Sequence, residues 1–294
     1  MDKMDVGRGV ELCYELRGAP DDPVIVLVAG LGRQMIGWDD DFCGLLADEG
    51  LRVLRFDNRD AGLSTRIEGA PGFDMAAARR GGRDAVAYTL DDMADDVDGL
   101  LAGLGIGSAH IVGTSMGGMI AQTLAIRNPT RVRSLCSIMS TTGADDVGRP
   151  TPKAMAVVMQ RPPEDRDSFV ASELRNSRVI GSRGGLVDED WRRGRFERFY
   201  DRGVDPAATS RQIMAIVASG DRTSALADVR VPTLVIHGDV DPLVPLSAGE
   251  ATARAIPGAE LLVIPDMGHE IPPATWPQVV AAIVAHARRE EVLR

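Results

Sequence analysis

Short apolar runs recur along the 294 residues of the chain, and stretches with helical spacing separate most of them. Runs rich in Val, Ile and Leu predict strands, and a continuous run closed by glycine is typical of a strand buried on both faces. The predicted strands cover residues 10–16, 24–29, 52–56, 109–112, 135–139, 233–236 and 261–264. Strands that alternate with helices favour a parallel sheet covered by helices, so we expect an α/β fold.

The clearest helical pattern lies in residues 90–104. Leucine, methionine and valine side chains repeat there at the spacing of one helix face, and aspartates occupy positions between them. The repeat predicts an amphipathic helix whose acidic side faces solvent.

The alternation of strands and helices stops between residues 142 and 227. Strand signals disappear there, charge rises, and strand signals resume at 231–234. Because the sheet pattern resumes, the simplest interpretation is a helical insertion into one sheet. We therefore predict a core of residues 1–141 and 228–294, with residues 142–227 as the inserted unit.

Composition narrows the class of partner. The 43 acidic and 33 basic residues give a formal charge of −10, which opposes non-specific attraction to nucleic acid or an anionic membrane. No apolar run approaches the roughly 18 residues of a membrane span, and the N-terminal residues lack the apolar core of a signal peptide. We expect a soluble, cytoplasmic protein with a small-molecule partner.

The three cysteines, Cys13, Cys43 and Cys136, lie in apolar stretches. An odd number without metal-like spacing indicates small buried hydrophobic residues and a reducing compartment. We expect neither a metal nor another cofactor.

The most informative stretch of the chain is Gly113-Thr114-Ser115-Met116-Gly117, between a predicted strand and a helical pattern. A serine in such a sharp turn adopts a strained backbone conformation, and glycines on either side remove side chains that would clash. The hydroxyl of Ser115 is then exposed as a nucleophile. A glycine-rich turn can contain a serine by chance, so the rest of the chain must supply its partners.

A serine nucleophile needs a base, and the chain has four histidines. His269 follows the last predicted strand, where its loop would emerge at the same sheet edge as Ser115. His110 lies within a predicted strand and favours a core position. His237 ends a strand and favours a structural hydrogen bond to the next loop, and His286 is expected on an exposed helix surface.

The acid that orients the base is expected in the loop after residues 233–236, which contains Asp239 and Asp241. We select Asp241 and keep Asp239 as the alternative, although either could cap the helix that begins near Ser247. The order Ser115, Asp241, His269 is the order used by hydrolases with a G-x-S-x-G elbow.

Cleavage of an acyl group also needs backbone N–H donors for the developing oxyanion. Met116, directly after the nucleophile, supplies one donor at the start of a helix. The second is expected from the loop that closes the strand 24–29, and Leu31 is the candidate. The glycines beside Leu31 would also fit an ordinary turn.

These motifs together resemble the α/β-hydrolase family, and within it small bacterial esterases of the aclacinomycin methylesterase type. The matching segments are residues 29–32, 57–64, 113–118, 238–245 and 267–269, and the likeness extends from about Val10 to His286. The resemblance implies a mostly parallel eight-stranded sheet with a helical cap inserted after the sixth strand. It also implies a serine esterase that cleaves small to medium hydrophobic carboxylic esters, including methyl esters, through an acyl-enzyme.

Other activities use the same serine machinery. A lactonase, a thioesterase, a carbon–carbon bond hydrolase and a perhydrolase remain alternatives, as does a non-catalytic receptor for a small ligand. Two positions depart from many relatives, Ala29 in place of His and Asp60 in place of Gly. We expect Asp60 to form a salt link with Arg59.

The insertion is expected to determine the substrate. Its apolar residues could line a cavity or simply form the core of the cap: Met155, Val157, Val158, Met159, Val170, Leu174, Trp191, Phe196, Phe199 and Tyr200. Its arginines could meet an anionic acyl group, although such runs are usually solvated: Arg192, Arg193, Arg195 and Arg198.

Overall fold

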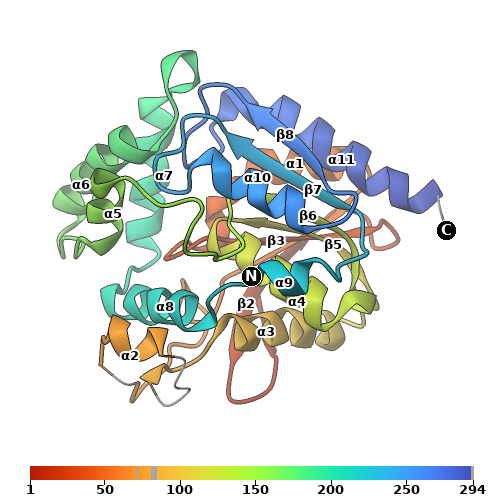
Figure 1. Ribbon diagram of the computed structural model, residues 1–294, viewed down its shortest axis with the longest axis horizontal. Helices are drawn as coiled ribbons and strands as arrows, with labels where there is room; N and C mark the ends of the chain where they lie inside the picture. Colours follow the sequence, from red (N-terminus) through yellow and green to blue (C-terminus); the bar gives the residue numbers. More distant parts are fainter. Residues whose placement is uncertain (71, 81–84, 293–294) are drawn as a thin grey trace.

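A computed structural model describes residues 1–70, 72–80 and 85–292 of the protein. Within these residues, eight strands form one sheet in the order β1-β2-β4-β3-β5-β6-β7-β8 (Figure 1). β1 pairs antiparallel with β2, and β2 pairs antiparallel with β4, while all other neighbours are parallel. The strands are β1 Asp2–Asp5, β2 Glu11–Arg17, β3 Val24–Val28, β4 Arg52–Phe56, β5 Ala109–Thr114, β6 Val132–Ile138, β7 Thr233–Gly238 and β8 Glu260–Ile264.

Helices cover both faces of the sheet. The α-helices are α1 Asp40–Asp48, α2 Met75–Arg79, α3 Leu90–Gly103, α4 Met116–Arg127, α5 Pro152–Met159, α6 Arg166–Ile180, α7 Glu189–Asp201, α8 Pro206–Ser219, α9 Thr223–Leu226, α10 Leu246–Ala255 and α11 Trp276–Val292. The 3₁₀ helices are η1 Met35–Gly37, η3 Pro129–Arg131, η4 Gly184–Leu186 and η5 Pro273–Thr275. One buried cluster joins the sheet to α3 and α4, and a second joins it to α1 and α11.

The fold class predicted from the sequence is confirmed, and each of the seven predicted strands is present. The apolar run of β3 is buried at every position, as expected for a strand with helices on both sides. β1 was not predicted because Asp2–Asp5 is polar and largely exposed. It is an edge strand that depends on its pairing with β2.

Helices α5 to α9 lie between β6, the sixth strand, and β7, as the interrupted pattern predicted. In Figure 1, α5, α6 and α7 gather at one side of the sheet, with α8 below them. Helices α6 and α7 pack through a small apolar cluster formed by Phe169, Val170, Leu174, Phe196 and Phe199. The division at residues 142 and 228 stays a prediction.

The prediction for His286 is wrong. His286 is buried, and its Nε2 lies 3.2 Å from the carbonyl oxygen of Pro232, so α11 turns this side chain toward the sheet. Burial lowers the pKa of the His286 imidazole, because the charged form loses its hydration.

Two expectations about acidic residues also need correction. The acidic side of α3 is not fully solvated, because Asp96 is buried against Arg59 with an Oδ2–Nε distance of 2.6 Å. Arg59 is therefore not the partner of Asp60. Asp60 instead accepts hydrogen bonds from Arg211 of α8, at 2.7 and 2.8 Å, and from the Tyr88 hydroxyl at 2.7 Å. Its φ of 65° lies in the left-handed region that favours glycine, the residue that the family resemblance leads us to expect at this position.

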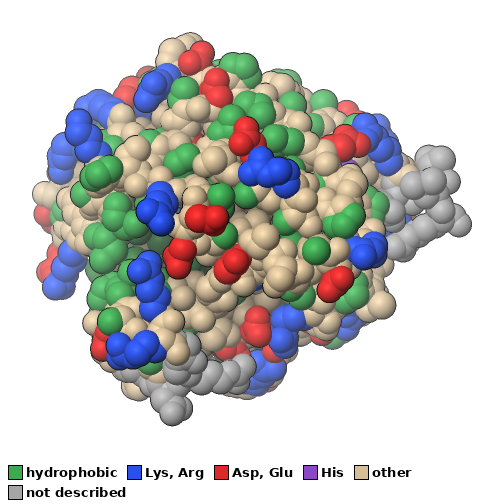
Figure 2. Space-filling model, in the orientation of Figure 1, with side chains coloured by type: hydrophobic (Ala, Val, Ile, Leu, Met, Phe, Trp, Pro, Cys, Tyr) green, Lys and Arg blue, Asp and Glu red, His purple; other side chains and the backbone are tan. Residues whose placement is uncertain are grey.

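The three cysteines are buried and unpaired, as expected. Among the described residues, no helix combines the length and apolarity needed to cross a bilayer. Figure 2 shows basic and acidic side chains interspersed over one face of the protein.

Candidate active site

Ser115 occupies the sharp turn between β5 and α4. Its backbone has φ 53° and ψ −119°, a left-handed conformation that non-glycine residues rarely adopt. Three backbone hydrogen bonds hold it there. Ser115 N donates to the Ile138 carbonyl at 2.9 Å, and Gly118 N and Met119 N donate to the Ser115 carbonyl at 2.9 and 3.2 Å. The Ser140 hydroxyl also donates to the Ser115 carbonyl at 2.8 Å. The turn is therefore fixed by the neighbouring strand β6 and by the first turn of α4.

The two glycines of the elbow are required by close backbone contacts. A Cβ atom at Gly113 would overlap the carbonyl of Gly117, and a Cβ atom at Gly117 would overlap the carbonyl of Val28 in β3. The turn can pack this tightly against the sheet only without side chains at both positions.

The structure brings Ser115, His269 and Asp241 together from three loops after β5, β7 and β8. His269 Nε2 lies 2.9 Å from Ser115 Oγ, and His269 Nδ1 lies 2.7 Å from Asp241 Oδ2. The other carboxylate oxygen of Asp241 accepts from the backbone N–H groups of Leu243 and Val244, at 2.8 and 2.9 Å. These bonds fix the Asp241 carboxylate, which in turn favours the His269 tautomer with its proton on Nδ1.

The alternative acid, Asp239, lies elsewhere. It is exposed, and its Oδ1 accepts from the backbone N–H of Asp266 at 2.7 Å, which ties together the loops after β7 and β8. His110 and His237 take the structural positions expected for them. His110 is buried in β5 with Nδ1 2.8 Å from Ser134 Oγ, and His237 Nε2 lies 2.7 Å from the Val244 carbonyl. Burial lowers the pKa of His237.

The loop that follows β3 lies directly over Ser115. A Cβ atom at Gly30 would lie 3.3 Å from the Cβ of Ser115, so Leu31, the next residue, is close to the nucleophile. Within the turn, Arg33 N donates to the Gly30 carbonyl at 3.1 Å. Met116, the second candidate donor, is the first residue of α4 and is fully buried.

Two side chains outside the predicted set hold this loop on either side of Leu31. Asn58 Nδ2 donates to the Ala29 carbonyl at 3.0 Å, and Gln212 Oε1 accepts from Gly32 N at 2.8 Å. Gln212 belongs to α8, is fully buried, and also donates to the Arg59 carbonyl at 2.9 Å. Asn58 lies within a motif visible in the sequence, whereas no local pattern marks Gln212.

The His269 loop is attached to the end of α6 and to the segment that follows it. His269 N donates to the Ile180 carbonyl at 2.7 Å, and the carboxylate of Glu270 accepts from Ser182 N at 2.8 Å. Arg192 of α7 forms a buried ion pair with Glu270, with an Nε–Oε2 distance of 3.2 Å. The inserted helices therefore support the imidazole as well as covering it.

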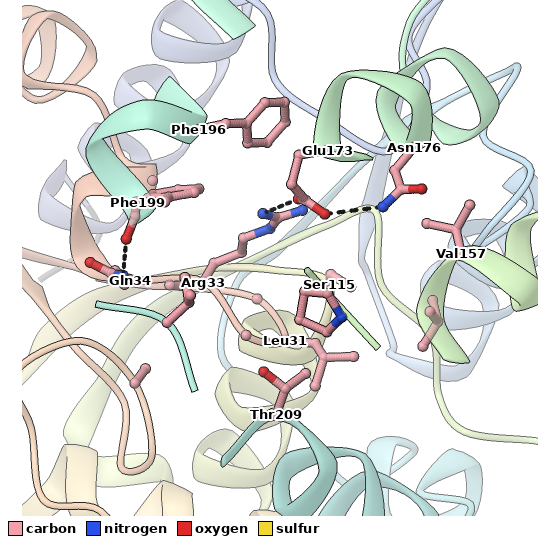
Figure 3. A pocket seen from close by; sticks show the side chains of 18 of the residues that line it. Leu31, Arg33, Gln34, Ser115, Val157, Glu173, Asn176, Phe196, Phe199 and Thr209 are labelled. Atoms are coloured by element: carbon pink, nitrogen blue, oxygen red, sulfur yellow. Dashed lines mark hydrogen bonds and ion pairs between the residues drawn. The ribbon is translucent and has the colours of Figure 1, made fainter. Parts of the chain in front are cut away.

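Ser115 and His269 open into a cavity of about 770 Å³. Figure 3 shows side chains of the inserted helices around the cavity, with Phe196 and Phe199 on one side of Ser115 in this view and Val157 on the other. Val158 and Met159 also line it.

The other predicted lining residues lie elsewhere. Val170 and Leu174 belong to the small cluster within the insertion. Met155 is exposed, the Trp191 indole N–H donates to Asp39, and the Tyr200 hydroxyl donates to the Glu164 carbonyl.

Comparison with known proteins defines the class. Residues 23–272 match the family model described as the alpha/beta hydrolase fold. The chain is 29% identical to the rhodomycin D methylesterase DnrP of Streptomyces peucetius over 315 aligned positions, which cover 99% of each chain.

Solved structures agree with this class. A hydrolase from Pseudomonas aeruginosa PA01 superposes with a TM-score of 0.73 at 26% identity, covering 97% of each chain. A meta-cleavage product hydrolase from Pseudomonas fluorescens IP01 has a TM-score of 0.77 over 98% of each chain, and at 21% identity it supports the fold alone. The protein belongs to the α/β-hydrolase family. It is a hydrolase of this fold whose relatives include methylesterases.

Proposed function

We propose that the protein is a serine esterase that cleaves carboxylic esters through an acyl-enzyme. The observation that carries the proposal is the chain of two hydrogen bonds from Ser115 Oγ to His269 and from His269 to Asp241, at 2.9 and 2.7 Å. A serine hydroxyl within hydrogen-bond distance of an imidazole that a carboxylate orients is the arrangement needed to activate it.

In the proposed mechanism, Ser115 Oγ attacks the ester carbonyl carbon while its proton passes to His269 Nε2. Asp241 stabilises the imidazolium through the hydrogen bond at Nδ1. The carbon–oxygen bond to the alcohol breaks as His269 returns the proton to the leaving oxygen. Water, deprotonated by His269, then attacks the acyl-enzyme and releases the acid and Ser115.

The tetrahedral intermediates carry an oxyanion, which we assign to the backbone N–H groups of Leu31 and Met116. The proximity of Gly30 to the Ser115 side chain supports the first assignment, and the place of Met116 at the start of α4 supports the second. Loss of one such donor typically costs about 10² to 10³ in rate.

The cavity supports a substrate with a sizeable apolar acyl group. Its volume of about 770 Å³ falls within the range that encloses most of a medium-sized organic ligand, and aromatic and aliphatic side chains form one wall. With methylesterases among the relatives, we propose methyl esters of bulky aromatic acids as the substrate class, under a cap formed by α5 to α9.

A panel of esters tests this proposal. The panel varies the acyl group and the alcohol, and includes methyl esters of aromatic acids together with a matched lactone and a matched thioester. We expect the highest kcat/KM for bulky methyl esters, and a loss of activity of at least about 10³-fold in Ser115→Ala. Faster turnover of the lactone or thioester would reassign the substrate class, and a fully active Ser115→Ala protein would refute the serine mechanism.

A further inference from the structure

The charged side chains that line the cavity form ion pairs, with one exception among the described residues. All five acidic lining residues have an arginine partner, namely Asp39 with Arg198, Asp60 with Arg211, Glu173 with Arg33, Asp205 with Arg66 and Glu270 with Arg192. Four arginines line the cavity, and three of them, Arg33, Arg66 and Arg161, pair with a carboxylate. The fourth, Arg195, has no carboxylate within 4.0 Å in the part of the chain that the structure describes.

Arg195 lies on α7 between aromatic rings. Its guanidinium carbon is 5.0 Å from the centre of the Trp191 ring and 5.4 Å from that of Phe199. Its Nη2 donates to the Gly37 carbonyl at 3.2 Å, while its Nε is buried and has no acceptor among the described residues. The two aromatic rings and one hydrogen bond thus hold the planar guanidinium in place, and several of its N–H groups remain available as donors.

Arg33 brings a second positive charge to the same region. Its guanidinium carbon lies 5.5 Å from the centre of the Phe199 ring, and Glu173 accepts from Arg33 Nη1 at 2.9 Å (Figure 3). Burial, and then the nearby charge of Arg33, lower the pKa of Arg195 to about 10, so the guanidinium stays protonated at neutral pH. Among the described residues, the cavity therefore contains one positive charge that no carboxylate contacts directly.

The neighbouring arginines of α7 do not share this environment. Arg192 is buried against Glu270, Arg198 donates to Asp39 at 3.0 Å, and Arg193 is exposed. Of the four arginines in this run, Arg195 alone lines the cavity.

We propose that Arg195, supported by Arg33, binds an anionic oxygen on the acyl part of the substrate. This inference rests on the proposed esterase function and specifies its substrate: an ester whose acid portion carries a carboxylate or an ionised phenol. A guanidinium forms strong charge-assisted hydrogen bonds with such oxygens, and half-buried Arg195, with its Nε buried, lacks a carboxylate partner among the described residues. In a methyl ester the alcohol is a single carbon, so nearly all of the substrate's bulk, and any charge that it carries, belongs to the acyl part.

Isosteric substrates test the proposal. The monomethyl esters of terephthalic and isophthalic acid carry a carboxylate, and their primary amide counterparts have the same shape without the charge. We expect wild-type protein to prefer the carboxylate over the amide in kcat/KM by at least about tenfold, a typical value for one charge-assisted contact. Arg195→Met is expected to reduce this preference by at least about tenfold, mainly through KM.

Arg193→Met, an exposed arginine on the same helix, is the matched control and should retain the preference. Arg195→Lys keeps the positive charge and should retain part of the preference for the carboxylate substrate. A merely structural role for Arg195 would not predict this result. Equal kcat/KM for carboxylate and amide in the wild type, or an unchanged preference in Arg195→Met, would overturn the proposal while leaving the esterase function intact.

A binding measurement separates the two proposals. Calorimetry with the free dicarboxylic acids on Ser115→Ala protein should detect binding that Arg195→Met abolishes in the same background. Binding without turnover of any ester by the wild type would support the anion subsite and count against the esterase function. No binding and no preference would overturn the subsite.

Discussion

The serine elbow and the cap wall of the cavity hold their polar groups in different ways. The elbow depends on backbone geometry: Ser115 has a positive φ, and Gly113 and Gly117 allow the turn to contact its neighbours. The cap wall depends on side-chain pairs between distant parts of the chain, such as Arg33 with Glu173 and Arg192 with Glu270. Backbone constraints restrict the residue types allowed at neighbouring positions. A long-range ion pair instead requires only that two positions far apart in the chain carry opposite charges.

This difference between the elbow and the cap wall predicts different functional roles for them. In the proposed mechanism, the elbow and its two partners carry out one reaction on any acyl group that reaches them. Under the proposal for Arg195, which has no carboxylate partner among the described residues, the wall selects which acyl group reacts. Changes at the elbow should therefore remove activity, and changes at the wall should alter stability or preference.

The largest effect is expected from Asp241→Asn. The asparagine would keep the size of the side chain but favour the wrong tautomer of His269, because Nδ1 would no longer face a carboxylate. We expect kcat to fall by about 10⁴-fold with little change in thermal stability. Asp239→Asn, two residues earlier in the same loop, is the matched control, and equal losses of kcat in both variants would contradict the assignment of the acid.

Arg192→Met tests how much the buried ion pair of the cap wall contributes to the free energy of unfolding. The Arg192 and Glu270 side chains are 2% and 7% exposed, and removing one partner leaves a buried charge, which typically costs about 3 to 5 kcal/mol. Chemical denaturation should show this loss, and the double variant Arg192→Met/Glu270→Met should recover part of it.

Arg166→Met provides the comparison for Arg192→Met. It removes an exposed ion pair between α6 and α7, with side chains 41% and 55% exposed, and should cost about 1 kcal/mol or less. A similar cost for both single variants would contradict the buried role of Arg192.

Gln212→Leu tests the hydrogen bond that joins α8 to the loop carrying Leu31. Without the acceptor for Gly32 N, the loop that carries Leu31 is less firmly held, so we expect kcat to fall about tenfold while KM changes little. Gln212→Glu keeps an acceptor for Gly32 N, so its kcat should fall less than that of Gln212→Leu. Gln122→Leu, another fully buried glutamine, controls for the loss of a buried amide, and a similar fall in its kcat would refute a positioning role for Gln212.

The smallest effect concerns pH. Burial lowers the pKa of His286 below the ordinary value of 6.5, so near and below that pH the unfolded chain binds more protons than the folded one. Stability should therefore fall as the pH drops through about 6.5. His286→Gln should show a smaller fall in melting temperature between about pH 7.5 and about pH 5.5. An identical fall in wild type and variant would contradict a neutral buried His286.

The sequence predicted the parts of the molecule that local patterns encode. Apolar runs located β3 to β8, and the residues directly after β5, β7 and β8 proved to be Ser115, Asp241 and His269, now within hydrogen-bond distance of one another. The carboxyl ends of parallel strands meet at one sheet edge, so loop position was enough to bring these residues together.

What the sequence missed depends on contacts between distant segments. β1 is polar and forms only through its pairing with β2. Asp60 pairs with Arg211, 151 positions further along the chain, and no spacing rule favours that partner over the adjacent Arg59. The four arginines of α7 look alike in the sequence. They differ only in their carboxylate neighbours, which come from distant segments and pair with Arg192 and Arg198.

The proposed reaction depends on acylation of the Ser115 hydroxyl. Intact-protein and peptide mass spectrometry after treatment with a fluorophosphonate probe tests it most directly. We predict one adduct, located on Ser115, absent from Ser115→Ala and formed far more slowly in His269→Ala. An adduct on another residue, or no adduct on a protein that still hydrolyses esters, would contradict the account.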